Sequence, residues 1–160
     1  MKDHAPIKRH QSIASFSRDH HSGLLLVWKI RHGLSKSTDP ERISEYVLFF
    51  YKEDLAKHFR DEEKLLFVRL PGDDLLRTQA ESDHQAICAL MAALEKNPED
   101  VSILRKIADA VEEHIRFEER ELFNHLQDIL SPEDLEAIAA RLPNDSKVCD
   151  EAWKDKFWLN

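Results

Sequence analysis

Two segments of this chain repeat one another with a spacing that is typical of a helix. Residues 58–67 read HFRDEEKLLF and residues 114–123 read HIRFEERELF, so each carries a histidine and, four residues later, a glutamate. On an α-helix, residues four apart stand one turn apart on the same face. Apolar side chains recur at helical spacing through both segments, which marks that face as the buried one. The repeats therefore predict two helices that bury a histidine and a glutamate among apolar side chains.

A capping residue, a proline and an acid mark the start of several predicted helices. Three such starts occur, at Asp39-Pro40-Glu41, Asn97-Pro98-Glu99 and Ser131-Pro132-Glu133. A further break falls at Pro71-Gly72-Asp73. Together these boundaries predict helices over about 12–35, 40–70, 73–96, 98–130 and 132–142.

Short connections between long helices force neighbours to run antiparallel. We therefore expect an all-α fold in which the first four helices form an up-down-up-down four-helix bundle, with a short C-terminal extra helix. The chain is expected to be a single domain over residues 1–160, with the bundle over about 12–130 and the C-terminal helix and tail over 131–160. The aromatic tail at 152–159 is expected to pack back onto the bundle.

The composition of the chain indicates which classes of partner it does not bind and in which cellular compartment it is expected. The net charge of −8 argues against a nucleic-acid partner, because a phosphate backbone is bound by basic surfaces. The longest apolar run, residues 24–28, is far shorter than the ~20 residues that span a bilayer, so no membrane partner is expected. The polar N-terminus and two cysteines without a CxxC pair predict a cytoplasmic protein.

The other two long helices offer histidines on their apolar faces. The third predicted helix holds His84, which is flanked at helical spacing by apolar residues. The first helix holds His20 and His21, which point about 100° apart. His20 shares its face with apolar side chains at 13, 16 and 27, whereas the face of His21 also carries polar residues. The pattern favours His20, and His21 stays open as the alternative.

Helix lengths indicate that these residues can meet. Counted from the predicted turns at 1.5 Å per residue, the histidines and glutamates of all four helices lie at similar heights along the bundle. Burying them is costly unless something satisfies their polar atoms, and a metal ion does so. The predicted metal ligands are His20, His58, Glu62, His84, His114 and Glu118.

The number and type of these ligands predict which metals fit. Imidazole and carboxylate donors without thiolate suit iron, manganese or zinc and exclude an iron–sulfur cluster. Six residues exceed the needs of one tetrahedral zinc ion. Two octahedral metals bridged by both glutamates would use these residues and leave positions open for water, O₂, peroxide or NO.

One histidine on each odd helix and HxxxE on each even helix closely resembles the hemerythrin-like (HHE cation-binding) family. The local sequences Ser17-Arg18-Asp19-His20-His21 and Ser82-Asp83-His84 are also similar to that family, and the resemblance spans roughly residues 7–130. It implies a four-helix bundle around two iron ions, a non-haem, oxo- or hydroxo-bridged di-iron centre held by the six residues above. It also implies a role in binding or sensing a small diatomic ligand or peroxide, or in handling iron.

The chain departs from the oxygen-carrying members of that family. Those proteins have a second histidine one turn away on the third helix, and here the corresponding positions are Ala80 and Cys88. One iron would then have fewer protein ligands, which favours ligand exchange or redox chemistry over reversible O₂ carriage. A di-iron oxidoreductase acting on peroxide or NO, or repairing iron centres, is the main alternative, and a metal-free helical interaction module is the second.

Several further residues carry expectations of their own. Asp54, one turn before His58, is expected either to orient a ligand imidazole or to lie exposed or salt-bridged. Cys88 is expected to be a small buried filler, with a redox-sensitive thiol as the alternative. His125 is too far along the helix from Glu118 to share its centre and is assigned to packing or to a channel wall. His10 is expected in a loose terminus.

Overall fold

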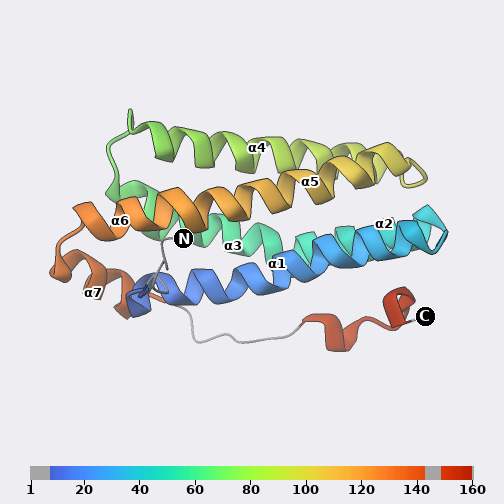
Figure 1. Cartoon of the computed structure of the whole chain (residues 1–160), viewed down its shortest axis with the longest axis horizontal. Coiled ribbons are helices and arrows are strands. Elements are labelled where there is room, and N and C mark those ends of the chain that lie inside the picture. The colour runs from blue at the N-terminus through green and yellow to red at the C-terminus, as the bar shows by residue number, and fades with distance from the viewer. Residues whose placement is uncertain (1–7, 143–148, 160) are drawn as a thin grey trace, which may run out of the picture.

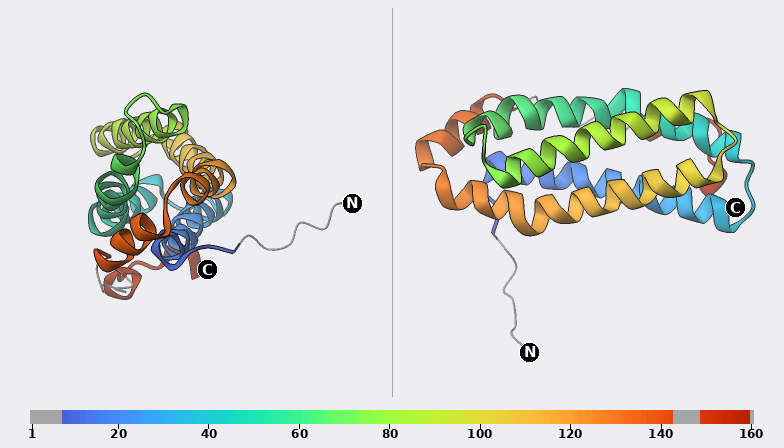
Figure 2. Two further views of the ribbon diagram at one scale, coloured as in Figure 1. Left: turned by 90° about the vertical axis from the view of Figure 1, so that its left-hand side faces the viewer. Right: turned by 90° about the horizontal axis from the view of Figure 1, so that it is seen from above.

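Four helical rods run antiparallel along the described part of the chain, and a computed structural model describes residues 8–142 and 149–159 (Figure 1). The first rod is residues 11–35, the second 40–69, the third 75–96 and the fourth 101–129, and the second and fourth rods are continuous helices that contain π-helical turns. The helical elements in chain order are α1 (Gln11–Ser35), α2 (Pro40–Phe50), a π-turn (Tyr51–Leu55), α3 (Ala56–Asp61), a π-turn (Glu62–Leu66), a 3₁₀ turn (Phe67–Arg69), α4 (Leu75–Lys96), α5 (Val101–Phe117), a π-turn (Glu118–Leu122), α6 (Phe123–Ile129), α7 (Pro132–Ala140) and two further 3₁₀ turns (Cys149–Ala152 and Phe157–Leu159). The end-on view in Figure 2 shows the rods at the corners of a square, which confirms the predicted all-α four-helix bundle with an extra C-terminal helix.

Side-chain caps start the helices close to the predicted places. Asp39 accepts a hydrogen bond from the backbone N–H of Glu41 at 3.1 Å, and Ser131 caps α7 in the same way. The prediction for the fourth rod was wrong by a few residues. Asp100, rather than Asn97, caps α5, and Pro98 lies in the preceding turn. Asp100 directly follows the Asn97-Pro98-Glu99 sequence and is also a good capping residue. Residues 97–99 form the turn that leaves α4, so α5 starts after Asp100.

The hydrophobic core is split into two parts by a polar layer. One cluster lies toward the α1–α2 and α4–α5 turns and includes Leu26, Phe59, Ile87 and Ile115. The other lies toward α7 and is formed by residues that include Ile13, Phe16, Leu66, Ala80 and Leu122. On each rod the predicted histidine or glutamate falls between the members of the two clusters. Apolar packing on both sides therefore clamps the polar layer at a fixed height.

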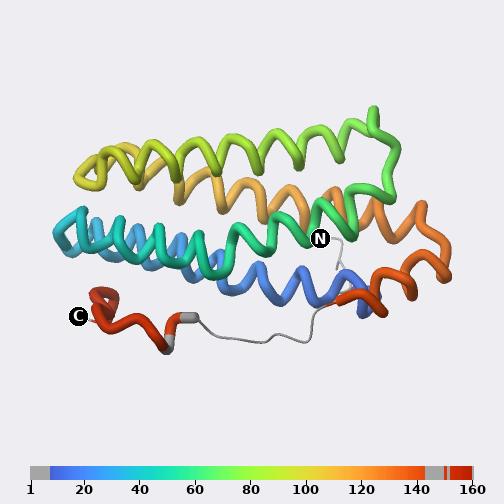
Figure 3. The backbone as a smooth tube through the Cα atoms, turned by 180° about the vertical axis from the view of Figure 1, so that it is seen from behind, coloured from blue at the N-terminus to red at the C-terminus, as the bar shows by residue number. Residues whose placement is uncertain are grey.

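The C-terminal tail packs against the outside of the bundle near the α1–α2 turn, as expected (Figure 3). The ring of Tyr46 lies 5.8 Å from Trp153 and 4.8 Å from Trp158, measured between centroids. Lys29 is buried beneath this tail, where its ammonium group contacts Asp150 and lies 3.9 Å from the ring of Trp158. A Cβ at Gly33 would come within 2.9 Å of Phe157, so glycine at this position lets the tail approach α1. Among the helices described, none is long and apolar enough to cross a bilayer.

Candidate metal centre

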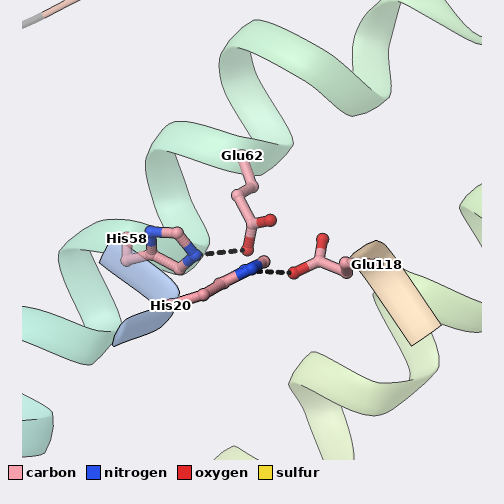
Figure 4. Close-up of side chains that lie close together, drawn as sticks. All are labelled: His20, His58, Glu62 and Glu118. Atoms are coloured by element: carbon pink, nitrogen blue, oxygen red, sulfur yellow. Dashed lines mark hydrogen bonds and ion pairs between the residues drawn. The ribbon is translucent and has the colours of Figure 1, made fainter. Parts of the chain in front are cut away.

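The six residues predicted as metal ligands come together in the polar layer. His20 comes from α1, His58 and Glu62 from the second rod, His84 from α4, and His114 and Glu118 from the fourth rod. None of the six is more than 6% exposed. Figure 4 shows four of them, with the carboxylates of Glu62 and Glu118 facing each other and the imidazoles of His20 and His58 pointing at them. The helix periodicity in the sequence thus placed all six side chains on the correct faces.

The two glutamates lie at the middle of the cluster. Oε1 of Glu62 lies 3.1 Å from Nε2 of His58 and 3.2 Å from Nε2 of His84. Oε1 of Glu118 lies 3.1 Å from Nε2 of His20 and 3.0 Å from Nε2 of His114. Each glutamate therefore contacts one imidazole from its own rod and one from a neighbouring rod.

Two overlapping groups of four residues each gather ligand atoms that all lie within 4.8 Å of one another. One group contains His20 and His58, the other contains His84 and His114, and both contain the two glutamates. Two positions that share both carboxylates are the arrangement expected of a pair of bridged metal ions.

Both glutamates begin a π-helical turn, Glu62–Leu66 and Glu118–Leu122. A π-turn adds a residue to a helical turn and is frequently found at functional sites. The widened turns follow the HxxxE pairs directly, so the two repeats share a backbone irregularity as well as a sequence. The periodicity of the sequence does not reveal these turns.

A second layer of carboxylates holds the outer nitrogen of every histidine in the cluster. Because a carboxylate can only accept, each Nδ1 donates its proton outward and each Nε2 faces the centre. The four contacts are His20 to Glu119 at 2.8 Å, His58 to Asp19 at 3.1 Å, His84 to Glu63 at 2.9 Å and His114 to Asp83 at 3.0 Å.

These outer carboxylates follow a simple rule in the sequence. Asp19 and Asp83 directly precede the histidines of α1 and α4, and Glu63 and Glu119 directly follow the central glutamates. Each rod thus supplies an inner residue and the outer carboxylate for an imidazole on another rod. Of the two alternatives left open for Asp54, the orientation of His58 is not the one observed, because Asp19 from α1 occupies the outer nitrogen of that ring. The Asp-His and Glu-Glu dipeptides are the signal that sequence reasoning missed.

The charges of the cluster favour protonated imidazoles at His20 and His114 in the metal-free protein. Burial alone would lower the pKa of His20, but hydrogen bonds to Glu118 and Glu119 outweigh it and raise the pKa to about 9. Burial is likewise outweighed at His114, where Glu118 and Asp83 raise the pKa to about 10. Conversely, burial would raise the pKa of Glu118, yet the adjacent His114 holds it well below its ordinary value. Protons on the imidazoles therefore neutralise carboxylates that a metal ion could neutralise instead.

Several buried polar atoms of the cluster make no hydrogen bond in the described part of the chain, although Oε1 of Glu62 lies within ion-pair distance of two imidazoles. These atoms are Nε2 of His58, both carboxylate oxygens of Glu62 and Oε2 of Glu118. Removing a carboxylate from water costs several kcal/mol, so unpartnered oxygens at the centre of a core call for a cation. The donor set and the orphaned atoms both fit a metal centre, and the buried histidines and glutamates match a metal-binding protein.

Aromatic rings fix the imidazoles from the sides. The ring of His84 stacks on Phe59 at 3.9 Å and lies 5.2 Å from Phe67. His20 stacks on Phe123 with a centroid distance of 5.3 Å and an angle of 3° between the planes. These rings exclude water from the ligand nitrogens and limit rotation of the imidazoles.

A small cavity of about 10 Å³ adjoins the centre, enough for about one water-sized molecule. Its walls combine three of the central histidines with apolar residues and two acids: His20, His58, His114, Gly23, Phe50, Leu55, Phe59, Ile87, Val111, Ile115, Asp19 and Asp54. Burial raises the pKa of Asp54 in this wall. The void therefore has room for about one water-sized molecule beside His20 and His58.

The structure also decides the open assignments outside the cluster. His21 is exposed, so His20 is the residue of α1 that faces the centre. The expectation of a buried Cys88 was wrong: the residue is exposed, and the hydroxyl of Tyr51 donates to its sulfur at 3.0 Å. His125 makes a packing contact, with Nε2 lying 2.7 Å from Asp74. His10 is held in place as the cap of α1, against the expectation of a loose terminus.

Comparisons with known proteins agree with this geometry. The chain is 33% identical over 112 residues to a protein described as a DNA nickase from Nostoc sp. (strain PCC 7120 / SAG 25.82 / UTEX 2576), a match that covers 66% of this chain and 32% of that protein. The chain thus spans about a third of the length of this relative. No solved structure matches significantly. The model of the hemerythrin HHE cation-binding domain matches residues 12–126, a stretch that contains all six central residues, and the chain therefore belongs to the hemerythrin HHE cation-binding domain family.

Proposed function

We propose that this protein binds two iron ions in the polar layer and uses them to bind or sense O₂, NO or peroxide, or to handle iron. His20 and His58 would hold one ion, His84 and His114 the other, and Glu62 and Glu118 would serve both. The single observation that carries the proposal is the set of orphaned oxygens on two buried glutamates, surrounded by four imidazole nitrogens. Manganese and zinc suit the same donors and are the alternatives to iron.

The chain's own residues prepare the site for this role. The outer carboxylates keep the Nδ1 protons of the imidazoles and so leave each Nε2 free to bind. When bound, ferrous ions supply electrons and open coordination positions. The adjoining cavity has room for about one water-sized molecule. Its apolar wall lowers the local dielectric constant, which strengthens the electrostatic interactions of a bound polar ligand.

Anaerobic titration of metal-free protein with Fe²⁺ tests the proposal. The expected result is saturation at about two ions per chain, followed by new near-ultraviolet absorption on exposure to air. Glu62→Gln and Glu118→Gln are expected to lose most of this binding, while Glu81→Gln, at a surface pair with Arg77, is expected to keep it. Saturation below two ions per chain would overturn the proposal. An unchanged melting temperature with chelator and with metal would instead support a metal-free interaction module, because a bound metal stabilises the folded state.

A di-iron oxidoreductase is the second candidate, and the cavity with Asp54 in its wall favours it over a pure iron store. Catalytic turnover of peroxide or NO by the iron-loaded protein separates the two. The activity named for the Nostoc relative is not carried over. The match covers 32% of that protein, and a net charge of −8 offers no electrostatic basis for binding a phosphate backbone.

A further inference from the structure

Arg9 lies just before α1, and its side chain is only 11% exposed. Its guanidinium group donates to Oδ1 of Asn124 at 2.6 Å and to the backbone carbonyl of Glu119. It also lies 3.3 Å from Oε2 of Glu119. The other oxygen of that carboxylate, Oε1, accepts hydrogen bonds from Nδ1 of His20 at 2.8 Å and from the hydroxyl of Ser17 at 2.7 Å. Arg9 therefore fixes the carboxylate that orients His20.

Arg9 also contacts the aromatic ring that packs on the same imidazole. Its guanidinium carbon lies 5.7 Å from the centroid of Phe123, within the range of a cation–π contact. Phe123 in turn stacks on His20 at 5.3 Å. Two separate supports of His20, one polar and one aromatic, thus contact a single arginine.

The segment around Arg9 is tied down independently of the metal centre. The backbone N–H of His10 donates to Oε1 of Gln127 at 3.0 Å, and Nε2 of the same glutamine donates to the carbonyl of Lys8 at 3.2 Å. The imidazole of His10 lies 3.1 Å from Glu136 on α7. Residues 8–10 therefore form a strap across α6 and α7 that holds Arg9 in place.

In the other half of the centre, the carboxylate that corresponds to Glu119 is Glu63, and it is less enclosed. Glu63 holds His84 in the same way that Glu119 holds His20, but it is 46% exposed. Within the residues that the structure describes, no arginine side chain pairs with Glu63. Glu63 and Glu119 occupy the same place in the two sequence repeats, 58–67 and 114–123. The difference in how these two carboxylates are held therefore comes from the strap.

We propose that Arg9 is a positioning residue for the metal-binding position of His20 and His58. It holds Glu119 and Phe123 so that His20 keeps its proton on Nδ1 and directs Nε2 to the centre. The position of His84 and His114 does not depend on it. This inference rests on the proposed two-metal centre, and it adds that the two positions differ in what maintains them.

Anaerobic Fe²⁺ binding by the full chain tests the inference, measured by competition with a chromogenic chelator. Arg9→Gln is the main variant and Arg9→Lys the conservative one. The matched control is Arg120→Gln, which removes the same charge from an exposed residue next to Glu119. We expect Arg9→Gln to bind its first ion as the unchanged protein does and its second ion about 10–100-fold more weakly. Arg9→Lys should be intermediate, and Arg120→Gln should match the unchanged protein.

A second measurement does not require iron. In metal-free protein, the Nδ1 proton of His20 should be visible by NMR as a slowly exchanging imidazole proton, and it should exchange faster in Arg9→Gln but not in Arg120→Gln. Equal loss of both ions in Arg9→Gln, or equal effects of Arg9→Gln and Arg120→Gln, would overturn the inference. If the unchanged protein binds fewer than two ions, the proposed function fails, and the exchange of the His20 proton alone decides the role of Arg9.

Discussion

Asp83 of α4 accepts a hydrogen bond from Nδ1 of His114 at 3.0 Å, across the interface between α4 and α5. The next residue of α4, His84, directs its Nε2 to within 3.2 Å of Nε2 of that same histidine. One dipeptide thus supplies both an inner imidazole and the outer carboxylate for the neighbouring imidazole. Each rod depends on another for the orientation of its ligand, so the site requires the assembled bundle.

Asp83→Asn is expected to weaken metal binding about 10–100-fold, the usual cost of losing a carboxylate behind a ligand histidine. The neutral amide is a weaker acceptor, so the imidazole of His114 becomes less basic and less firmly oriented. Chelator competition with Fe²⁺ measures the change. Glu81→Gln removes the same charge from the same helix at a surface pair and serves as the control. Equal affinities of the two variants would contradict the role assigned to Asp83.

The stability of the metal-free protein is expected to fall as the pH rises above neutrality. The pKa of His20 is raised from 6.5 to about 9 and that of His114 from 6.5 to about 10. Between pH 6.5 and the raised pKa, each histidine keeps its proton in the folded protein but loses it in the unfolded chain. The stabilisation from the two histidines is therefore complete below about pH 6.5 and is lost by about pH 10. Glu118 has the opposite sign: its lowered pKa stabilises the fold above about pH 4.5, and this contribution is lost on acidification.

Urea unfolding in the presence of EDTA at several pH values measures this dependence. Glu118→Gln removes a carboxylate that raises the pKa of both histidines, and it should flatten the alkaline limb. Loading with Fe²⁺ should remove that limb too, because metal binding replaces the protons. A free energy of unfolding that stays constant from pH 6.5 to 10 in metal-free protein would contradict the assignment.

Asp74 joins two helices, and its loss is expected to destabilise the fold without affecting the metal centre. Its side chain accepts from the backbone N–H groups of Leu76 and Arg77 at 3.0 Å and contacts His125 of α6 at 2.7 Å. Burial would raise the pKa of Asp74, but the contact with His125 and the backbone hydrogen bonds lower it. Asp74→Ala should cost about 1 kcal/mol or somewhat more, the usual value of a helix cap.

Thermal unfolding and Fe²⁺ binding are the two measurements for this variant. Because the pKa of Asp74 is lowered, its stabilisation should be present above about pH 4 and fade below it. Asp100→Ala is the control and should have a smaller effect, because in the described part of the chain the side chain of Asp100 caps α5 without bonding to another helix. Loss of metal binding in Asp74→Ala would contradict the expectation that this contact between α4 and α6 acts on the stability of the fold alone.

The C-terminal tail is expected to depend on the charge pair beneath it. Asp150→Asn leaves the buried ammonium group of Lys29 without its carboxylate, which should cost roughly 1–3 kcal/mol. Lys29→Met removes the charge itself and should cost less, since an apolar side chain of similar length fills the same space. Fluorescence of Trp153 and Trp158 during unfolding reports on the tail. A larger loss in Lys29→Met than in Asp150→Asn would contradict this account.

The sequence alone determined the architecture and the inner layer of the site. Helical periodicity fixes the angle between residues on one helix, so the apolar stripe through His114 and Glu118 was enough to place both in the core. Proline and capping residues likewise marked most helix ends, with the start of α5 as the exception. Such local rules act within one or two turns and do not depend on how the rods are packed.

Only the tertiary structure decided which residues support the ligands. Asp19 rather than Asp54 holds His58, and Cys88 lies outside the core, because the rotation and axial offset between rods determine which side chains meet. Arg9 reaches Glu119 across 110 residues of sequence, a contact that no local pattern predicts. The choice of the six inner residues follows from the period of a helix, whereas the outer layer follows from the way in which four helices pack against one another.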